Sequence, residues 1–263
     1  MNLKKPNFWD QKQPNLYSYL LLPITFILKI FYYFKRITAS QKMNIKTICV
    51  GNFYIGGTGK TSLCIKIKKI LEKKNIKSCF IKKFYKSQFD EQKLLSNNGK
   101  LFTSSTRRKA IQKAIDENYE IAILDDGIQD KSIEYDLSFI CFNNINWIGN
   151  GMTIPSGPLR EDIQNLKYYD HVFLNGNLEN LSEIKTKILN INSKINIHLG
   201  KYEIINLNEF KKDDDYLVFS GIGNHSTFIS MIKNNGFNIK KDFEFSDHHQ
   251  YSEKDLNKII SEA

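Results

Sequence analysis

The chain has 263 residues, of which 38 are Lys or Arg and 28 are Asp or Glu, so its formal net charge is +10. Hydrophobic residues make up 41% and aromatic residues 13% of the sequence, enough to bury a core, which excludes a disordered chain. With only 14 Gly and 5 Pro, collagen-like and low-complexity chains are excluded as well.

The charge is divided unevenly along the chain. Residues 1–113 carry 24 basic and 4 acidic side chains, whereas residues 114–263 carry 14 basic and 24 acidic side chains. A basic block of this size indicates an anionic partner. The chain is also rich in Lys, Asn and Ile, as AT-rich coding would make it, and both causes contribute to the surplus.

The first predicted element is an almost wholly apolar helix at residues 16–34, interrupted by Pro23 and Lys29. About 20 clean apolar residues are needed to cross a bilayer, so the two interruptions argue against a membrane span. The segment lacks a small-residue cleavage site, so a secretory signal is not expected. Its aromatic residues and basic flanks suit an interfacial anchor on anionic lipid, and the alternative is an ordinary core helix.

The next element is a short buried strand, predicted by the β-branched apolar run at residues 45–50. The sequence GNFYIGGTGKTS follows it and leads into an amphipathic helix, LCIKIKKILEKKNIKS. A strand, a glycine-rich turn, GKT and a helix in this order predict a phosphate-binding loop for an ATP-type nucleotide.

The chemistry of such a loop explains its residue types. Its glycines let backbone N–H groups approach phosphate oxygens, and Lys60 is expected to contact the β- and γ-phosphates. The Thr61 hydroxyl is expected to ligate Mg²⁺. The predicted nucleotide-binding residues are Gly56, Gly57, Thr58, Gly59, Lys60, Thr61 and Ser62.

A second strand is predicted at residues 119–124, where an apolar run closes on Asp125, Asp126 and Gly127. An acid at the carboxyl end of a strand beside a phosphate loop orients Mg²⁺ or its waters, so Asp125 is the predicted metal partner of Thr61. The alternative is a simple Asp-Asp-Gly turn. Between the two strands, residues 107–115 predict a helix whose paired Arg contact phosphate or form a solvated face.

Three motifs together are specific: GNFYIGGTGKTS, LDDGIQD and GNGMTIPSGPLRED. They resemble those of the tetraacyldisaccharide 4′-kinase family, the membrane-associated lipid A kinases of Gram-negative bacteria. The segment IPSGPLRE is the most discriminating, because generic P-loop proteins have no reason to carry it. Later landmarks of the family, VFLNGN, FSGIGN and FSDHHQYSEKDL, follow in the right order.

The resemblance implies an enzyme that uses ATP and Mg²⁺ to phosphorylate the 4′-hydroxyl of a tetraacyl disaccharide 1-phosphate in lipid A biosynthesis. It implies Asp90 of FDEQ as the base, helped by His248 of SDHH, with Asp126 as a second acidic candidate. It further implies attachment to the anionic cytoplasmic face of the inner membrane, peripheral or monotopic, through the N-terminal helix.

The sequence departs from the family pattern in several places. The usual Ser-Arg-Gly-Tyr-Gly-Gly run is replaced by KKFYKS at residues 82–87, and the loop from there to Asp90 is shorter than usual. The family's DDGxQH motif ends here in Asp130. The family normally continues beyond the position of Ala263, so a divergent short form or a truncated C-terminal domain is expected.

These elements predict an α/β fold of the P-loop NTPase type, with a mostly parallel sheet, helices on both faces and a smaller second α/β domain. The predicted units are an N-terminal membrane-associating helix, a kinase core, a linker with short strands and a C-terminal domain. Their ranges are 1–38, 39–177, 178–214 and 215–263.

Two other function classes compete with a lipid kinase. A P-loop ATPase or GTPase switch or a metallochaperone module is disfavoured, because Ile55 replaces the signature Lys and no Asn-Lys-x-Asp motif is present. The strict phosphate-loop pattern also fails, since Tyr54 stands where it requires Gly. Nucleic acid is not an expected partner, because the basic half lacks an interleaved aromatic platform. No obligate protein partner is inferred.

Overall fold

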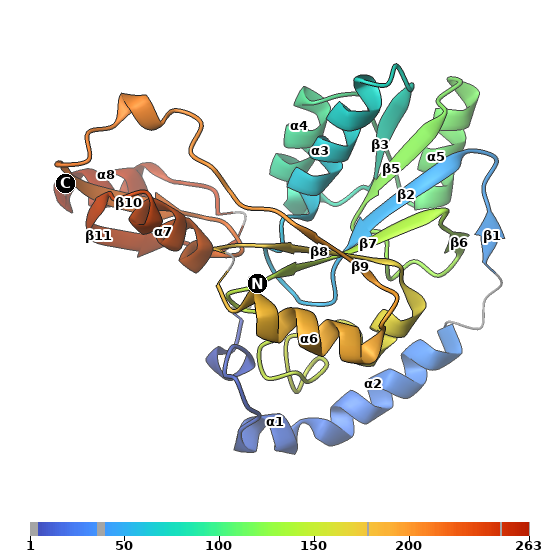
Figure 1. Cartoon of the computed structure of the whole chain (residues 1–263), viewed down its shortest axis with the longest axis horizontal. Helices are drawn as coiled ribbons and strands as arrows, with labels where there is room; N and C mark the ends of the chain where they lie inside the picture. The colour runs from blue at the N-terminus through green and yellow to red at the C-terminus, as the bar shows by residue number, and fades with distance from the viewer. Residues whose placement is uncertain (1–4, 36–39, 178, 248, 263) are drawn as a thin grey trace.

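The structure, a computed structural model, describes residues 5–35, 40–177, 179–247 and 249–262. Its centre is a parallel seven-stranded sheet with the order β4-β3-β5-β2-β7-β8-β9 (Figure 1). The strands are β2 (Lys46–Gly51), β3 (Ser78–Lys83), β4 (Leu101–Ser104), β5 (Ile121–Asp125), β7 (Leu137–Asn143), β8 (His171–Asn175) and β9 (Asn196–Leu199). The predicted parallel α/β sheet is confirmed.

Helices cover both faces of this sheet. One face is covered by α3 (Lys60–Glu72) and α4 (Phe89–Asn97), and the other by α5 (Arg107–Asp116), α6 (Leu181–Ile191) and the 3₁₀ helix Ile163–Tyr168. Successive strand residues point to opposite faces, so Val50 and Ile123 lie in the α3 core whereas Cys49 and Leu124 lie in the α5 core. Because both faces are buried, the strands are nearly continuous apolar runs.

The N-terminal segment forms two short helices, α1 (Leu16–Leu20) and α2 (Leu22–Lys35), which lie along one side of the core (Figure 1). Among the described residues, no helix has the length and apolar character that crossing a membrane requires. After α2, the short strands β1 (Gln41–Lys42) and β6 (Ile133–Glu134) pair in parallel beside the main sheet.

The C-terminal residues form a small second unit on the opposite side from α5 (Figure 1). Its parallel strands are β10 (Asp215–Ser220) and β11 (Asn238–Glu244), and its helices are α7 (His225–Asn234) and α8 (Glu253–Glu262). The remaining elements are three 3₁₀ turns, Asn7–Trp9, Lys86–Gln88 and Leu207–Glu209.

The segment expected as a linker, residues 178–214, differs from that expectation. Its first part folds as α6 and β9, and β9 pairs with β8 as the last strand of the main sheet. The short strands expected in this linker include the run YEIINL, but its residues 202–207 form no strand. The connection between the two units is therefore residues 200–214.

Candidate active site

The phosphate-binding loop joins the end of β2 to the start of α3, which begins at Lys60. Gly59 has φ 77°, a left-handed conformation that glycine adopts without steric cost. A Cβ at Gly59 would lie 2.0 Å from Nδ2 of Asn175, so the position has no room for a larger residue. Lys60, Thr61 and Ser62 form the first turn of α3, where the helix dipole favours an anion.

The loop fits a bound phosphate in two respects. Its glycines let neighbouring groups pack tightly against the loop and hold its backbone in place, and Oγ1 of Thr58 is buried without a hydrogen-bond partner among the described residues. The sequence-predicted residues 56–62 thus lie together in one loop and helix turn, with a backbone shape suited to a phosphate chain.

Asp125 ends β5, the strand next to β2, and is fully buried. The Thr61 hydroxyl donates to Oδ2 of Asp125 at 3.2 Å, so the structure brings the predicted metal pair together. A hydroxyl and a carboxylate are ligands that Mg²⁺ prefers. The described ranges hold no cluster of three or more His, Cys, Asp or Glu that could bind a metal ion.

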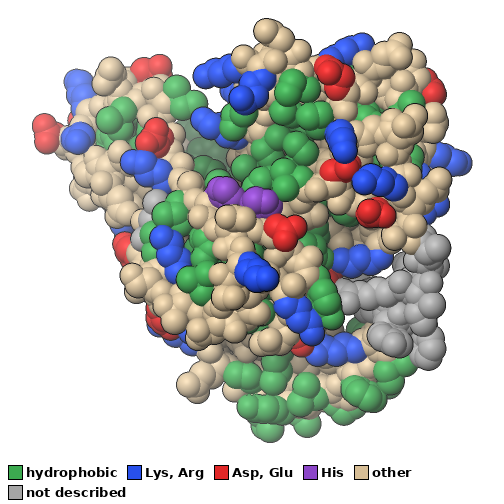
Figure 2. Space-filling model, turned by 45° about the vertical axis from the view of Figure 1, so that its right-hand side comes forward, with side chains coloured by type: hydrophobic (Ala, Val, Ile, Leu, Met, Phe, Trp, Pro, Cys, Tyr) green, Lys and Arg blue, Asp and Glu red, His purple; other side chains and the backbone are tan. Residues whose placement is uncertain are grey.

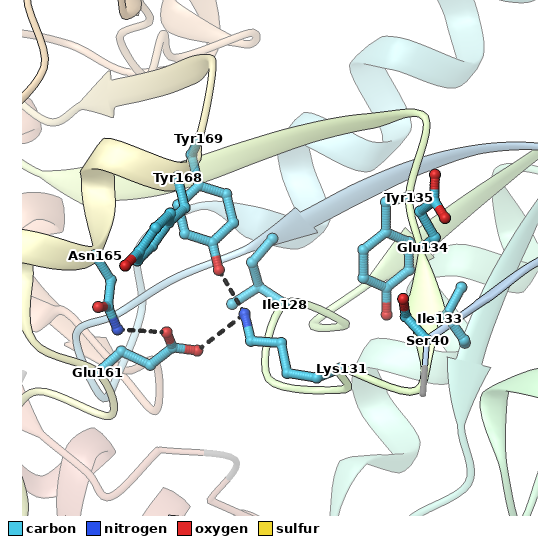
Figure 3. A pocket seen from close by; sticks show the side chains of 10 residues that line it. All are labelled: Ser40, Ile128, Lys131, Ile133, Glu134, Tyr135, Glu161, Asn165, Tyr168 and Tyr169. Atoms are coloured by element: carbon cyan, nitrogen blue, oxygen red, sulfur yellow. Dashed lines mark hydrogen bonds and ion pairs between the residues drawn. The ribbon is translucent and has the colours of Figure 1, made fainter. Parts of the chain in front are cut away.

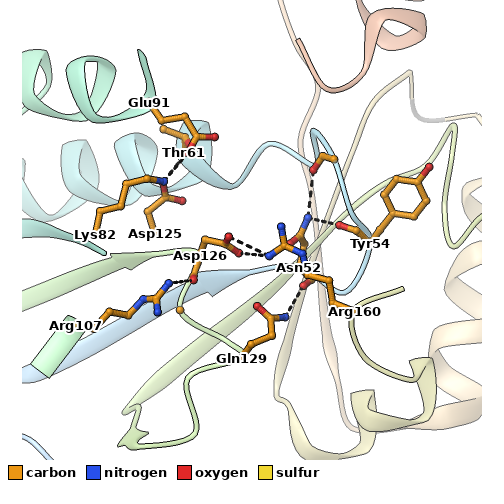
Figure 4. A network of polar contacts seen from close by, with 12 residues as sticks. Asn52, Tyr54, Thr61, Lys82, Glu91, Arg107, Asp125, Asp126, Gln129 and Arg160 are labelled. Carbon is orange, nitrogen blue, oxygen red and sulfur yellow. Dashed lines mark hydrogen bonds and ion pairs between the residues drawn. The ribbon is translucent and has the colours of Figure 1, made fainter. Parts of the chain in front are cut away.

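A buried lysine, which the sequence did not single out, lies beside this pair (Figure 4). Lys82 of β3 forms ion pairs with Asp125 at 2.6 Å and with Glu91 of α4 at 2.5 Å. Burial would lower the pKa of Lys82, but the two carboxylates raise it above its usual value, so the ammonium stays charged. Lys82 stands in the run that replaces the usual Ser-Arg-Gly-Tyr-Gly-Gly, and it places a positive charge beside Asp125, the residue predicted to bind the metal.

Asp126 is held by two arginines. Nη1 of Arg160 donates to both carboxylate oxygens, at 2.8 and 3.0 Å, and Arg107 donates to the Asp126 carbonyl (Figure 4). Burial alone would raise the pKa of Asp126, but the charges of Lys60 and Arg160 lower it to about 2, so the carboxylate is ionised at neutral pH.

The sequence left two roles open for the paired arginines, a phosphate contact or a solvated face, and the contacts of Arg107 exclude the second. Its guanidinium is 3.5 Å from Asp130 as well as bonded to the Asp126 carbonyl, so it braces the Asp125–Asp130 loop instead of forming a solvated face. Arg160 could have been singled out from the sequence, because it lies in the discriminating IPSGPLRE segment. Its partner Asp126 was itself a predicted candidate, but the pairing of the two could not be predicted, because they lie 34 residues apart in the chain.

The second unit lies over the phosphate loop. A Cβ at Gly223 would be 2.5 Å from the backbone nitrogen of Gly57 and 2.9 Å from Oδ2 of Asp247. This close approach needs glycine on both sides, which is a physical reason for the FSGIGN and GGTGKT sequences. The nucleotide loop is therefore covered by the turn between β10 and α7.

The two remaining predicted catalytic residues are less well placed. Asp90 lies exposed in the first turn of α4, next to Glu91, which is the residue that reaches Lys82. His248 lies outside the described residues. Its neighbour His249 has Nε2 3.1 Å from Asp255 and stacks on Phe245 with ring centroids 4.7 Å apart, so His249 serves a local structural contact.

The segment of residues 154–161 joins the site to the N-terminal helices. The Trp9 indole donates to the carbonyl of Pro155 at 3.0 Å, and the hydroxyls of Thr25 and Ser156 are 2.8 Å apart. Asn150 donates to the Ser18 hydroxyl at 3.0 Å. Ser18 and Thr25 are both buried, so the inward faces of α1 and α2 are held by polar contacts.

The outward faces of α1 and α2 are apolar, and Figure 2 shows this green surface along the lower side of the molecule. We call these ten exposed side chains the outer face: Leu16, Tyr17, Tyr19, Leu20, Leu22, Ile24, Phe26, Ile27, Ile30 and Phe31. A helix at the surface of a water-soluble core normally has the reverse arrangement. The segment is thus not an ordinary core helix.

A cavity of about 410 Å³ lies between β6, the Asp125–Asp130 loop and the 3₁₀ helix Ile163–Tyr168 (Figure 3). Tyr135, Tyr168 and Tyr169 give it aromatic walls. Glu161, which directly follows Arg160, accepts from Asn165 at 3.0 Å and lies 3.6 Å from Lys131. The cavity thus combines aromatic surface with hydrogen-bonding groups close to the Arg160–Asp126 pair.

Comparison with known proteins gives consistent matches. Residues 17–263 match the family model described as tetraacyldisaccharide-1-P 4′-kinase. A curated tetraacyldisaccharide 4′-kinase of Pelagibacter ubique is 60% identical over 263 residues, which cover 100% of this chain and 84% of the relative. The corresponding protein of Rickettsia canadensis is 33% identical over 281 residues, with the same two coverages.

Among solved structures, LpxK from Aquifex aeolicus, crystallised with ATP, aligns with a TM-score of 0.63. The alignment covers 90% of this chain and 84% of that one at 22% sequence identity, so it supports the fold alone.

Proposed function

The chain belongs to the tetraacyldisaccharide-1-P 4′-kinase family, and we propose that it transfers the γ-phosphoryl group of ATP to the 4′-hydroxyl of a tetraacyl disaccharide 1-phosphate. One observation carries the proposal. Residues 154–161 contact α2 through Ser156 and the preceding N-terminal turn through Pro155, and they reach the phosphate site through Arg160. An enzyme that phosphorylates a lipid needs this connection between a membrane-facing surface and a nucleotide site.

On the nucleotide side, phosphoryl transfer depends on positioning and charge stabilisation more than on covalent chemistry by the protein. The phosphate loop holds the triphosphate, and the Lys60 ammonium stabilises the negative charge that develops on the transferred phosphoryl group. Thr61 and Asp125 are the residues that would hold Mg²⁺. Bound there, Mg²⁺ would supply neutralisation of the phosphate charge.

On the acceptor side, the ionised Asp126 and its partner Arg160 lie between the phosphate loop and the segment that contacts α2. We assign them the orientation of the sugar hydroxyl and of the phosphoryl oxygens. Nη1 of Arg160 already donates to both carboxylate oxygens of Asp126, and a guanidinium, with its several N–H donors, suits phosphate oxygens as well.

The proposed base remains Asp90, assisted by His248. Both come from the family resemblance, and their support in the structure is indirect. Asp90 lies one residue from Glu91, which contacts Lys82 beside Asp125. The neighbours of His248 lie near the turn that covers the phosphate loop, since Cβ atoms at Gly221 and Gly223 would meet His249 and Asp247. The structural role of His249 leaves His248 as the histidine for proton transfer.

The disaccharide is large, and the cavity beside Arg160 suits one of its rings. Aromatic walls with a carboxylate and an amide are typical of polar, ring-shaped ligands, and about 410 Å³ is within the usual range of ligand pockets. We infer that the sugar not being phosphorylated lies towards this cavity while its partner ring reaches Asp126.

The outer face supports attachment to a membrane. Its ten apolar side chains suit the headgroup and acyl boundary of a bilayer, and basic residues near the ends of the two helices suit anionic lipid. We propose that α1 and α2 lie in the surface of the inner membrane at its cytoplasmic face, where the acyl chains of the substrate are anchored.

The test is ATP-dependent phosphorylation of a tetraacyl disaccharide 1-phosphate in mixed micelles. We expect phosphate at the 4′-position with the wild-type chain and its loss with Asp126→Asn, while Lys66→Ala, an exposed site on α3, keeps full activity. A folded wild-type chain that hydrolyses ATP but leaves the lipid unphosphorylated would refute the proposed function.

A further inference from the structure

A row of buried polar groups connects the phosphate loop to the second unit. Nδ2 of Asn175 donates to the Thr58 carbonyl at 2.7 Å, and Oδ1 of Asn175 accepts from Nδ2 of Asn143 at 3.3 Å. The same Nδ2 of Asn143 donates to the Thr227 hydroxyl of α7 at 2.8 Å. Each of the four residues is at most 5% exposed.

These residues come from four separate elements. Thr58 lies in the phosphate loop, Asn143 ends β7, Asn175 ends β8, and Thr227 lies in the first turn of α7. The carboxyl ends of parallel strands are where open α/β sheets place ligands, so two buried amides at the ends of neighbouring strands are well positioned to act on the loop.

The contact at Thr58 controls the direction of a donor. In a trans peptide the carbonyl and the following N–H point in opposite directions. When Asn175 fixes the Thr58 carbonyl on its own side, the N–H of Gly59 in the same peptide points away from Asn175. Gly59 is held in its left-handed conformation beside Asn175, so this peptide plane has one orientation.

The other end of the row depends on where α7 lies. Thr227 follows Asn224, whose side chain caps α7 by accepting from the Thr227 N–H at 3.1 Å. The backbone of Asn224 also lies against Gly57, because a Cβ at Gly57 would be 3.2 Å from the Asn224 nitrogen. A shift of α7 away from the core would therefore release both Gly57 and the Thr227 contact.

We propose that Asn143 and Asn175 are positioning residues that couple the shape of the phosphate loop to the docking of α7. With α7 docked, Thr227 orients the Asn143 amide, Asn143 orients Asn175, and Asn175 sets the Thr58 peptide for phosphate binding. By linkage, ATP bound in the loop holds α7 in place to the same extent. The proposal rests on the proposed function only in that the loop binds ATP.

The first experiment measures ATP affinity calorimetrically on the full chain in detergent, without lipid. Thr227→Val keeps the shape of the side chain and removes the acceptor, and we expect about fivefold weaker ATP binding, the effect of one hydrogen bond. The matched control is Ser230→Ala. It removes a different contact between α7 and the core, from Asn177 at 3.4 Å, and should leave ATP affinity within twofold.

The second experiment separates positioning from a general loss of stability. Asn175→Ser and Thr227→Val act on one row, so their effects on ATP affinity should be less than additive in the double variant. The proposal would be overturned if the two effects on ATP affinity were additive, or if Ser230→Ala weakened ATP binding as much as Thr227→Val does. If Asn175→Ser does not fold, hydrogen exchange decides: ATP should slow exchange of the α7 amides in the wild type and not in Thr227→Val.

The outcomes distinguish this proposal from the kinase proposal. A wild-type chain that phosphorylates the lipid, together with unchanged ATP affinity in Thr227→Val, overturns the coupling alone. A wild-type chain that binds ATP with the expected coupling and never phosphorylates lipid overturns the kinase function alone. A folded chain with no affinity for ATP overturns both.

Discussion

The phosphate site and the outer face of α1 and α2 place their polar and apolar groups in opposite ways. At the phosphate site, charged groups are inside: Lys82 and Asp125 are buried and paired with each other. On α1 and α2, small polar groups such as Ser18 and Thr25 are inside and large apolar side chains are outside. Both arrangements depart from the ordinary distribution of residue types in a soluble domain.

In the proposed function the two regions have different surroundings: the phosphate site faces a charged nucleotide, and the outer face meets a membrane surface. Buried ions are tolerated where they are paired and can meet a charged ligand, whereas exposed apolar side chains are stable where a bilayer covers them. Residues 154–161 contact both regions, so each region can be altered while the other is kept as an internal control. The predictions below use this separation.

The largest effect is expected from Lys60→Ala. Loss of the charge that faces the transferred phosphoryl group should reduce kcat by about 10²- to 10³-fold, as for other groups that stabilise a transition state. Binding to anionic vesicles should stay at the wild-type level, because α1 and α2 are untouched. Radiolabelled phosphate transfer and vesicle co-sedimentation measure the two properties on one preparation.

The converse change is Phe26→Ser combined with Ile27→Ser on the outer face. At the lower end of the usual range each apolar side chain lost from a bilayer costs about 1.5 kcal/mol, so the two changes together should lower vesicle binding by about 10²-fold, while ATP affinity stays constant. Ile70→Ser, at a half-exposed apolar site on α3, is the matched control. Equal losses of vesicle binding from both changes would contradict the assignment of α2 to the membrane.

A smaller effect is expected from the ionisation of Asp126. Its pKa in the folded chain, about 2, is below the ordinary 3.8, so its contribution to stability is complete above about pH 4 and disappears as the pH falls towards 2. The contribution is about 2 kcal/mol. In the Asp126→Asn variant, the free energy of unfolding, measured with urea, should no longer contain this contribution to its fall between about pH 4 and pH 2.

The control for this change is Asp116→Asn, at an exposed site that ends α5. It should keep the full pH dependence of the unfolding free energy between pH 2 and pH 4. If Asp126→Asn keeps that dependence as well, the Arg160 contact does not hold an ionised carboxylate.

The smallest effect is expected on the inner side of α2. Thr25→Val removes the hydroxyl that contacts Ser156 and leaves that partner without its bond, at a cost of about 1 kcal/mol. Thermal unfolding should detect this loss, and vesicle binding should not change because the outer face is intact. A clear fall in vesicle binding would mean that the polar contacts, and not the apolar side chains, determine attachment.

Much of the nucleotide side could be predicted from the sequence because its signals are local. A strand, GGTGKT and a helix lie within 30 residues, and Asp125 directly follows an apolar run. The partners of those residues could not be predicted in this way. Lys82, Glu91 and Arg160 reach the site from other elements, and only the order of strands brings them to Asp125 and Asp126.

The missed helix at residues 181–191 has a different cause. Leu181, Ile184 and Ile188 have helical spacing and cover the sheet, but they stand among Asn and Lys residues that resemble a linker in composition. Ile184 and Ile188 are buried and Leu181 is partly buried against the same core, and this packing stabilises the helix. The amino-acid composition was therefore a poor predictor of secondary structure in this segment, where the helical spacing of apolar residues extends over only a few positions.

The outer face also determines how the chain behaves at high concentration in water. Ten large apolar side chains on two adjoining helices form the kind of surface that associates with a copy of itself when nothing else covers it. Self-association and vesicle binding then compete for the same surface. Apparent vesicle affinity should weaken as protein concentration rises in detergent-free buffer, and a detergent that disperses the aggregates should restore a single sedimenting species.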